Sequence, residues 1–141
     1  MILLDTNLIS EPWKPQPNPK IIAWIDAQAI ETLFLSAITI AELRFGIAAM
    51  PPGKRRQILH ERLENQLLPL FAQRILPFDL KASRAYADLM AKAKTAGQPI
   101  NQPDGLIAAI AATHNLSVAT RDTTPFHTAG IPTINPWTLA A

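Results

Sequence analysis

The sequence contains no cysteine among its 141 residues. Disulfide bonds and thiolate metal sites are therefore excluded, which agrees with a reducing compartment. A strong excess of one charge is also missing, because 13 Lys and Arg side chains against 11 Asp and Glu give a formal net charge of +2. That balance is too small to indicate nucleic-acid binding by itself.

No apolar run is long enough to span a bilayer, and the amino-terminal segment lacks a basic leader. We therefore expect a cytoplasmic protein with no signal peptide and no membrane contact. Hydrophobic residues make up 48% of the chain. This content is enough to bury a core in one ordinary domain, which we expect to span residues 1–141.

Short apolar runs alternate with amphipathic stretches along the chain. Strands are predicted over residues 1–4, 33–36, 74–78, 116–120 and 133–134. Helices are predicted over residues 19–28, 39–48, 54–68, 80–96 and 103–115, and the proline-rich residues 11–19 are predicted as an extended connection. This alternation implies an α/β fold, a three-layer α/β/α sandwich with a mostly parallel central sheet of four to five strands.

Acidic residues fall where this topology would bring them to one edge of the sheet. Asp5 directly follows the first predicted strand, and Asp122 follows the fourth. Glu42 and Asp104 lie in the first turns of two predicted helices. Because open α/β folds bind ligands at the carboxyl ends of their strands, the four positions together predict a shared site.

Each acid also has an ordinary structural explanation. Thr39 and Glu42 have the spacing of a capping box, which is the favoured role of Glu42 considered alone. Asp104 is placed to interact with a helix dipole, and Asp122 fits a turn. Asp5 is the hardest to explain in this way, because burial of an unpaired carboxylate is costly.

Carboxylates gathered at one rim repel each other unless a cation neutralises them. Oxygen ligands without cysteine, and with no histidine placed among them, favour Mg²⁺ or Mn²⁺ over Zn²⁺. Such ions retain water and accept phosphate oxygens, which indicates phosphodiester chemistry. Asp79 also follows a predicted strand, but helix capping accounts for it and we exclude it from the site.

The residues around these acids resemble a known family. The matching stretches are 5–7, 38–43, 103–109, 119–122 and 135–137. They resemble the motifs of PIN-domain ribonucleases, in the same order and over essentially the whole chain. More narrowly, the chain is similar to VapC-type toxins of bacterial toxin–antitoxin modules, in their FitB-like branch.

This resemblance implies a PIN-domain sandwich and an endoribonuclease that depends on Mg²⁺ or Mn²⁺. The acidic positions of the family carry over to Asp5, Glu42, Asp104 and Asp122. The polar groups that would support them are Thr6, Asn7 and Thr120. We expect Asp5 and Asp104 to hold the metal most directly, with the other two acids binding through water or positioning the attacking water.

The fourth motif departs from the family pattern. Many relatives carry Asp-Phe where Pro125 here precedes Phe126. Asp122 either substitutes for that acid or is the only fourth acid, and both alternatives stay open. Two roles are likewise open for Arg121 as a supporting residue, namely a phosphate contact or an ion pair with Asp122.

Other side chains are candidates for RNA contacts. Trp24 and Trp137 could stack on bases, although a place in the core or a dimer surface is preferred for Trp24. The basic helix over residues 54–62 is more simply explained as a solvated face than as an RNA contact.

The resemblance also implies binding partners. These are an RNA substrate, a second copy of the chain, and a cognate antitoxin of the FitA/VapB type that blocks the acidic pocket. The DNA-binding part of the antitoxin would take a larger hetero-oligomer to operator DNA.

The main alternative function is a weakly catalytic partner that dimerises the antitoxin and tightens operator binding. A DNA-directed nuclease is disfavoured by the lack of an extended basic surface, and an aspartyl-phosphate phosphatase by Asn7.

Overall fold

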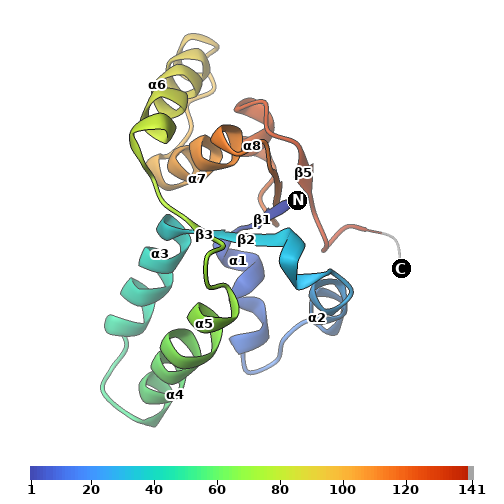
Figure 1. Cartoon of the computed structure of the whole chain (residues 1–141), viewed down its shortest axis with the longest axis vertical. Helices are drawn as coiled ribbons and strands as arrows, with labels where there is room; N and C mark the ends of the chain where they lie inside the picture. Colours follow the sequence, from blue (N-terminus) through green and yellow to red (C-terminus); the bar gives the residue numbers. More distant parts are fainter. Residues whose placement is uncertain (140–141) are drawn as a thin grey trace.

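Parallel strands form the centre of the computed structural model, which describes residues 1–139 (Figure 1). The strands are β1 (Ile2–Leu4), β2 (Leu33–Ser36), β3 (Ile75–Leu76), β4 (Ser117–Ala119) and β5 (Thr133–Ile134). Their order across the sheet is β3-β2-β1-β4-β5, and every neighbouring pair is parallel. The predicted α/β class and the number of strands are therefore confirmed.

Strand β1 lies in the middle of the sheet, and the winding of the chain reverses beside it. The chain first moves outward from β1 through β2 to β3, and then returns to place β4 and β5 on the other side of β1. The carboxyl ends of β1 and β4 are therefore neighbours at a topological switch point. Doubly wound sheets commonly bind their ligands at such a point.

Helices cover both faces of the sheet (Figure 1). One face carries α1 (Thr6–Ile9), α2 (Pro19–Asp26), α3 (Ala37–Ala48), α4 (Lys54–Arg62) and α5 (Leu68–Leu70). The other face carries α6 (Leu80–Thr95), α7 (Gln102–Thr113) and α8 (Thr124–Thr128). Short turns of other helical types are η1 (Glu11–Trp13), η2 (Ile30–Thr32) and η3 (Leu63–Leu67). This arrangement confirms the three-layer sandwich.

Successive side chains of the central strands point to opposite faces of the sheet, so the apolar side chains are divided between two cores. Leu3 and Val118 belong to the core beneath α6 and α7, whereas Leu4 and Ala119 belong to the core on the opposite face. All four are fully buried. Successive residues of a strand point to opposite faces, so a strand covered on both sides is apolar throughout. Packing on both sides thus fixes the position at which β1 ends.

Polar side chains set the starts of the main helices. Asn18 accepts a hydrogen bond from the Lys20 backbone N–H at 3.0 Å and begins α2, as predicted. Ser36 accepts from the Thr39 N–H at 3.0 Å, so α3 begins at Ala37, earlier than predicted. Asp79 caps α6 by accepting from the Ala82 N–H at 2.9 Å, which confirms its structural role.

Four short helical segments were not predicted. They are α1, η1, η2 and α8, and η1 lies within the stretch predicted to be extended. Proline is compatible with the first turn of a helix, where backbone N–H groups lack partners within the helix, and this explains why Pro12 does not prevent η1. Glu11 is buried there, accepts from the Asn18 N–H at 3.0 Å and pairs with Lys14 at 2.9 Å.

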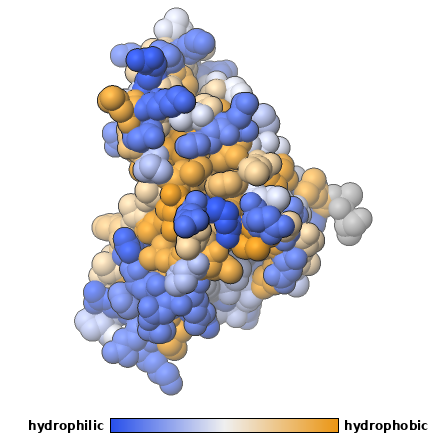
Figure 2. Space-filling model, in the orientation of Figure 1, coloured by the Kyte–Doolittle hydropathy of each residue, from blue (hydrophilic) through white to orange (hydrophobic). Residues whose placement is uncertain are grey.

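Large apolar side chains are exposed on helices of both layers. Phe45 of α3 is 75% exposed, Leu70 of α5 is 55% exposed and Leu80 of α6 is 88% exposed. Figure 2 shows apolar surface gathered across the middle of one face of the molecule. No helix within residues 1–139 combines the length and the apolar character needed to cross a membrane.

Candidate active site

Asp5 lies at the switch point between β1 and β4. Its backbone N–H donates to the Ala119 carbonyl at 2.9 Å, which extends the pairing of the two strands by one residue. One carboxylate oxygen, Oδ1, accepts from the Thr6 N–H at 2.8 Å, and the other, Oδ2, accepts from the Thr120 hydroxyl at 2.8 Å. Only 6% of Asp5 is exposed, so the carboxylate is held in one place.

The electrostatics of Asp5 are unfavourable to its ionised form. Burial raises the pKa of Asp5 to about 6, against the hydrogen bonds from Thr120 and Thr6, which lower it. The negative charges of Asp104 and Glu42 raise this pKa further, which shows that both acids lie close enough to act on Asp5. Perturbed carboxylates of this kind are concentrated at functional sites.

Glu42 reaches the same site from α3. Its Oε1 accepts from the Thr6 hydroxyl at 2.8 Å, and that hydroxyl also lies 3.2 Å from the hydroxyl of Thr39. Since Ser36 caps α3, Thr39 lies inside the helix and cannot form the predicted capping box with Glu42. The capping role is therefore wrong, and the side chain of Glu42 is directed to the turn that follows Asp5.

Asp104 lies in the first turn of α7. The Asn101 side chain accepts from the Asp104 N–H at 3.0 Å and donates to its carboxylate at 2.7 Å, a reciprocal pair that caps the helix and orients the acid. Burial raises the pKa of Asp104, the Asn101 hydrogen bond opposes this, and the charge of Asp122 raises it again. Asp104 thus contributes to the helix start and also interacts with two other acids.

Asp122 is exposed in the turn after β4. Its N–H donates to the Thr120 hydroxyl at 3.1 Å, and the amide of Asn7 donates to the same hydroxyl at 3.4 Å. The Arg121 N–H donates to the Asn7 carbonyl oxygen at 3.3 Å. These bonds connect the turn after β1 with the turn after β4, so Asp122 keeps a fixed position relative to Asp5.

The Arg121 guanidinium lies over the Trp137 ring, 5.5 Å from its centroid. Within residues 1–139 it forms no ion pair with Asp122, which was one of its two predicted roles. The side chain therefore remains available at the edge of the acidic site.

Comparison with known proteins identifies the family of this fold and site. The family described as PIN domain matches residues 2–131. The chain belongs to the PIN-domain family. VapC ribonuclease Y4jK of Sinorhizobium fredii is 65% identical over 97% of this chain and 98% of that protein. Toxin FitB of Neisseria gonorrhoeae is 55% identical over 97% of this chain and 99% of that protein.

A solved structure extends the similarity to three dimensions. It is described as FitAB bound to an IR36 DNA fragment, and its matching chain is 52% identical to this PIN domain. The match has a TM-score of 0.96 and covers 100% of this chain and 99% of that chain. The similarity therefore includes the arrangement of the whole fold.

The donor set of this PIN-domain site consists of carboxylates with neutral hydroxyls and amides around them. Within residues 1–139, no three Asp, Glu, His or Cys side chains lie together in a group that could hold a metal ion as they stand. The acids instead interact through their charges. Asp104 and Glu42 raise the pKa of Asp5, and Asp122 raises the pKa of Asp104. This open set of hard oxygen donors fits a cation that keeps most of its waters, such as Mg²⁺.

Sequence reasoning missed three polar residues of the site. Ser36 and Thr39 link the end of β2 to Thr6, and Asn101 holds Asp104. The spacing of Asn101 and Asp104 is that of a helix cap and could have identified this pair. Ser36 and Thr39 have the same spacing of three residues, and so do Thr39 and Glu42. The sequence alone therefore does not decide whether Ser36 or Thr39 caps the helix.

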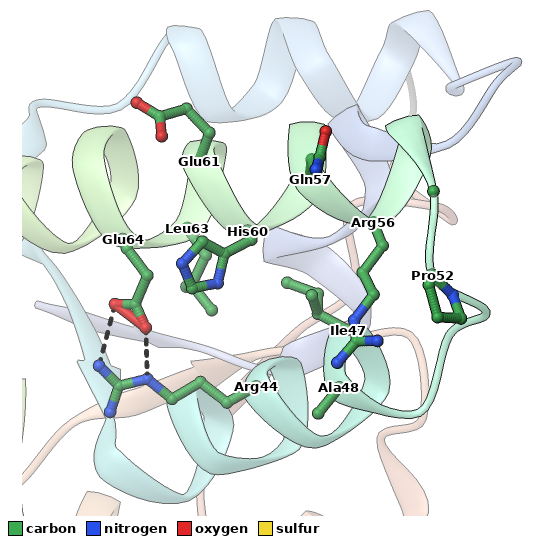
Figure 3. A pocket seen from close by; sticks show the side chains of 11 residues that line it. Arg44, Ile47, Ala48, Pro52, Arg56, Gln57, His60, Glu61, Leu63 and Glu64 are labelled. Atoms are coloured by element: carbon green, nitrogen blue, oxygen red, sulfur yellow. Dashed lines mark hydrogen bonds and ion pairs between the residues drawn. The ribbon is translucent and has the colours of Figure 1, made fainter.

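A cavity on one face of the sheet lies apart from the acids. It measures about 720 Å³ between α3 and α4, and Figure 3 shows Arg44 and Glu64 joined across it by hydrogen bonds of 2.8 and 3.0 Å. None of the four predicted acids lines this cavity. A shallower cleft of about 460 Å³ includes Asp122 and Asn101, and therefore adjoins the acidic site.

Proposed function

We propose that this PIN-domain protein is a divalent-metal-dependent endoribonuclease and the toxin of a toxin–antitoxin pair. The observation that carries the proposal is the buried Asp5 carboxylate, whose raised pKa reflects burial and the nearby charges of Asp104 and Glu42. The names VapC ribonuclease and Toxin FitB, carried by relatives of nearly full coverage, support the reaction and the biological role.

Asp5 and Asp104 are the residues that would hold Mg²⁺ or Mn²⁺ most directly. When bound, such an ion lowers the pKa of a coordinated water and stabilises negative charge on the scissile phosphate. Thr120 and Thr6 hold the Asp5 carboxylate, and Asn101 holds that of Asp104. Hydrogen bonds of this kind orient carboxylates that bind a metal.

Glu42 and Asp122 complete the acidic site at its more open edges. The Thr6 hydroxyl donates to Oε1 of Glu42. The second carboxylate oxygen of Glu42, Oε2, would then orient an attacking water. The exposed carboxylate of Asp122 is placed to act on Asp104 or on a bound water. We assign both acids to water-mediated contacts, in agreement with their greater exposure.

The partner assignments follow from the relatives and from the exposed apolar residues. A relative solved as FitAB on DNA supports a cognate FitA/VapB-type antitoxin that takes the pair to operator DNA. Phe45, Leu70 and Leu80 would be covered by a second copy of this chain or by the antitoxin. We place the protein in the cytoplasm, where RNA is available.

Asp104→Asn tests the proposed reaction. We expect Mg²⁺-dependent cleavage of RNA to fall by at least about a hundredfold, because even outer-shell partners of metal ligands can change activity by 10–100-fold. Cleavage of labelled single-stranded and structured RNA would be measured by gel electrophoresis. Asp79→Asn is the matched control, since Asp79 also lies at a helix start and asparagine preserves its capping role.

Full activity of the Asp104→Asn protein would contradict the assignment of this residue. The alternative function, a weakly catalytic partner of the antitoxin, predicts a different pattern. The wild-type protein would then cleave RNA only weakly with either metal but would still tighten binding of the antitoxin to its operator. Both properties can be measured on the same preparation.

A further inference from the structure

Arg121 is an exposed cation next to an acidic site, yet it binds none of the acids. The ion pairs within residues 1–139 are Lys14–Glu11 and Arg44–Glu64. The guanidinium of Arg121 donates no hydrogen bond within that part of the chain, and it rests on the Trp137 ring at 5.5 Å. Its N–H groups are therefore available to a ligand.

Asn135 joins Arg121 and Trp137 into one unit. Its side-chain amide donates to the Arg121 carbonyl at 3.3 Å, and its side-chain oxygen accepts from the Trp137 N–H at 3.0 Å. Trp137 packs against a hydrophobic core, which fixes its ring. Contact with an aromatic face restrains a guanidinium without using its hydrogen-bond donors.

The same unit is connected to the acidic site and to a second cation. The Arg121 N–H donates to Asn7, whose amide donates to the Thr120 hydroxyl that holds Asp5. Lys20 of α2 donates to the Trp137 carbonyl at 3.4 Å, which brings its ammonium group next to the unit. Arg121 and Lys20 thus both contact Trp137, and Arg121 is in addition linked to the acidic site.

We propose that Arg121 and Lys20 bind backbone phosphates of a single-stranded RNA next to the scissile phosphate, with Trp137 as the positioning residue of Arg121. This inference rests on the proposed function. Clustered carboxylates repel a polyanion, so cations beside them offset that repulsion and guide the strand. A planar guanidinium with free donors suits phosphate oxygens.

The chemistry of this cationic unit would also accept an acidic side chain of a protein partner. RNA is favoured because Arg121 precedes Asp122 directly and shares the Asn7–Thr120 connection with Asp5. This arrangement gives Arg121 a fixed position relative to the predicted reacting phosphate. A protein contact has no need for such a connection.

Binding of RNA can be measured separately from cleavage. The probe is a short fluorescein-labelled single-stranded RNA in EDTA, followed by fluorescence anisotropy at several salt concentrations. For Arg121→Gln we expect about tenfold weaker binding and a salt slope smaller by about 0.7, the value of one phosphate contact on a single strand. Arg121→Lys, which keeps the charge, should retain an intermediate affinity.

Control variants distinguish this effect from a general loss of charge or of structure. Arg84→Gln removes an exposed arginine of α6 and should leave RNA affinity unchanged. Trp137→Leu keeps apolar bulk but removes the aromatic face, so it should weaken binding less than Arg121→Gln does. Thermal melting of each variant reports its folding. In cleavage assays, Arg121→Gln should raise KM more than it lowers kcat.

Equal RNA affinity of the wild-type and Arg121→Gln proteins would overturn the inference. Weaker binding of an acidic partner peptide with unchanged RNA affinity would also overturn it and would assign Arg121 to a protein contact. If the wild-type protein binds RNA through Arg121 but cleaves none with Mg²⁺, the proposed reaction fails and the RNA-binding unit stands. If it cleaves RNA and Arg121→Gln binds normally, only the unit fails.

Discussion

Asp5 is a single residue at which function and stability oppose each other. Its pKa rises from an ordinary value of 3.8 to about 6 on folding, chiefly because the carboxyl is buried. Ionisation of Asp5 is therefore easier in the unfolded chain than in the folded protein. At neutral pH and without a bound cation, its negative charge destabilises the fold.

This shift predicts the pH dependence of stability. Because the folded-state pKa is raised, the folded protein binds more protons than the unfolded chain between about pH 4 and 6. In EDTA, we expect the contribution of Asp5 to the free energy of unfolding to fall by roughly 3 kcal/mol as the pH rises through this window, and then to level off. Urea denaturation at a series of pH values measures it.

Asp5→Asn is the control for this pH dependence. Asparagine is nearly isosteric and cannot ionise, so the variant should lack the decrease and become more stable than the wild-type protein near pH 7. Glu11 and Glu64 have lowered pKa values and give an opposite trend in both proteins, so their contributions cancel in the difference between the two curves. That difference reports Asp5 together with its interaction with Asp104, whose pKa is also raised. Parallel curves would contradict the assigned shift.

The residue types near strand ends predicted which side chains form the site. They did not predict the hydrogen-bond partners of those side chains. Asp5 was recognisable because an acid directly follows an apolar run. The partner of Glu42 was assigned wrongly, since Thr39 lies three residues after Ser36 and three before Glu42. The end of β2 at Ser36 decides where α3 begins, and tertiary pairing sets that end.

Among the helices, α2 and α7 begin in a similar way but are expected to differ in function. Each is capped by an asparagine, Asn18 or Asn101, followed by a turn that contains proline. Only Asn101 also donates to an acid of the site, through its 2.7 Å bond to Asp104. A comparison of the two caps therefore distinguishes the effect of a cap on helix stability from its effect on the orientation of the Asp104 carboxylate.

Alanine substitution at the two caps tests this distinction. Asn18→Ala and Asn101→Ala should each lower the free energy of unfolding by about 1 kcal/mol. Asn101→Ala should in addition reduce RNA cleavage about tenfold, because Asp104 loses the group that orients it. Equal activity of the two variants would show that Asn101 acts on helix stability alone.

Elements with a regular apolar pattern were predictable, and short turns were not. The runs 33–36 and 133–134 became β2 and β5 with the predicted bounds. The run 33–36 is mostly apolar because β2 is covered on both faces of the sheet. Segments such as α8, with five residues, are too short to show a helical period. Their conformation depends on the contacts of residues such as Phe126, which is fully buried.

At the scale of the whole molecule, the order of the strands brings the acids together. Alternating strands and helices predicted a parallel sheet, but the sequence did not contain the order β3-β2-β1-β4-β5. That order places Asp5 beside Thr120, 115 residues later in the chain, at the switch point. The alternation predicted that the acids share one edge of the sheet, and the resemblance to PIN domains added Thr120 to the site, but neither gave the strand order.

A crystal structure with Mn²⁺ would test the central claim most directly, because anomalous scattering locates the ion without reference to activity. We expect one or two peaks among the carboxylates of Asp5, Glu42, Asp104 and Asp122, with Asp5 and Asp104 as direct ligands. The peaks at Asp5 should disappear in crystals of the Asp5→Asn variant. Mn²⁺ bound only elsewhere, or a site that survives this substitution, would contradict the account.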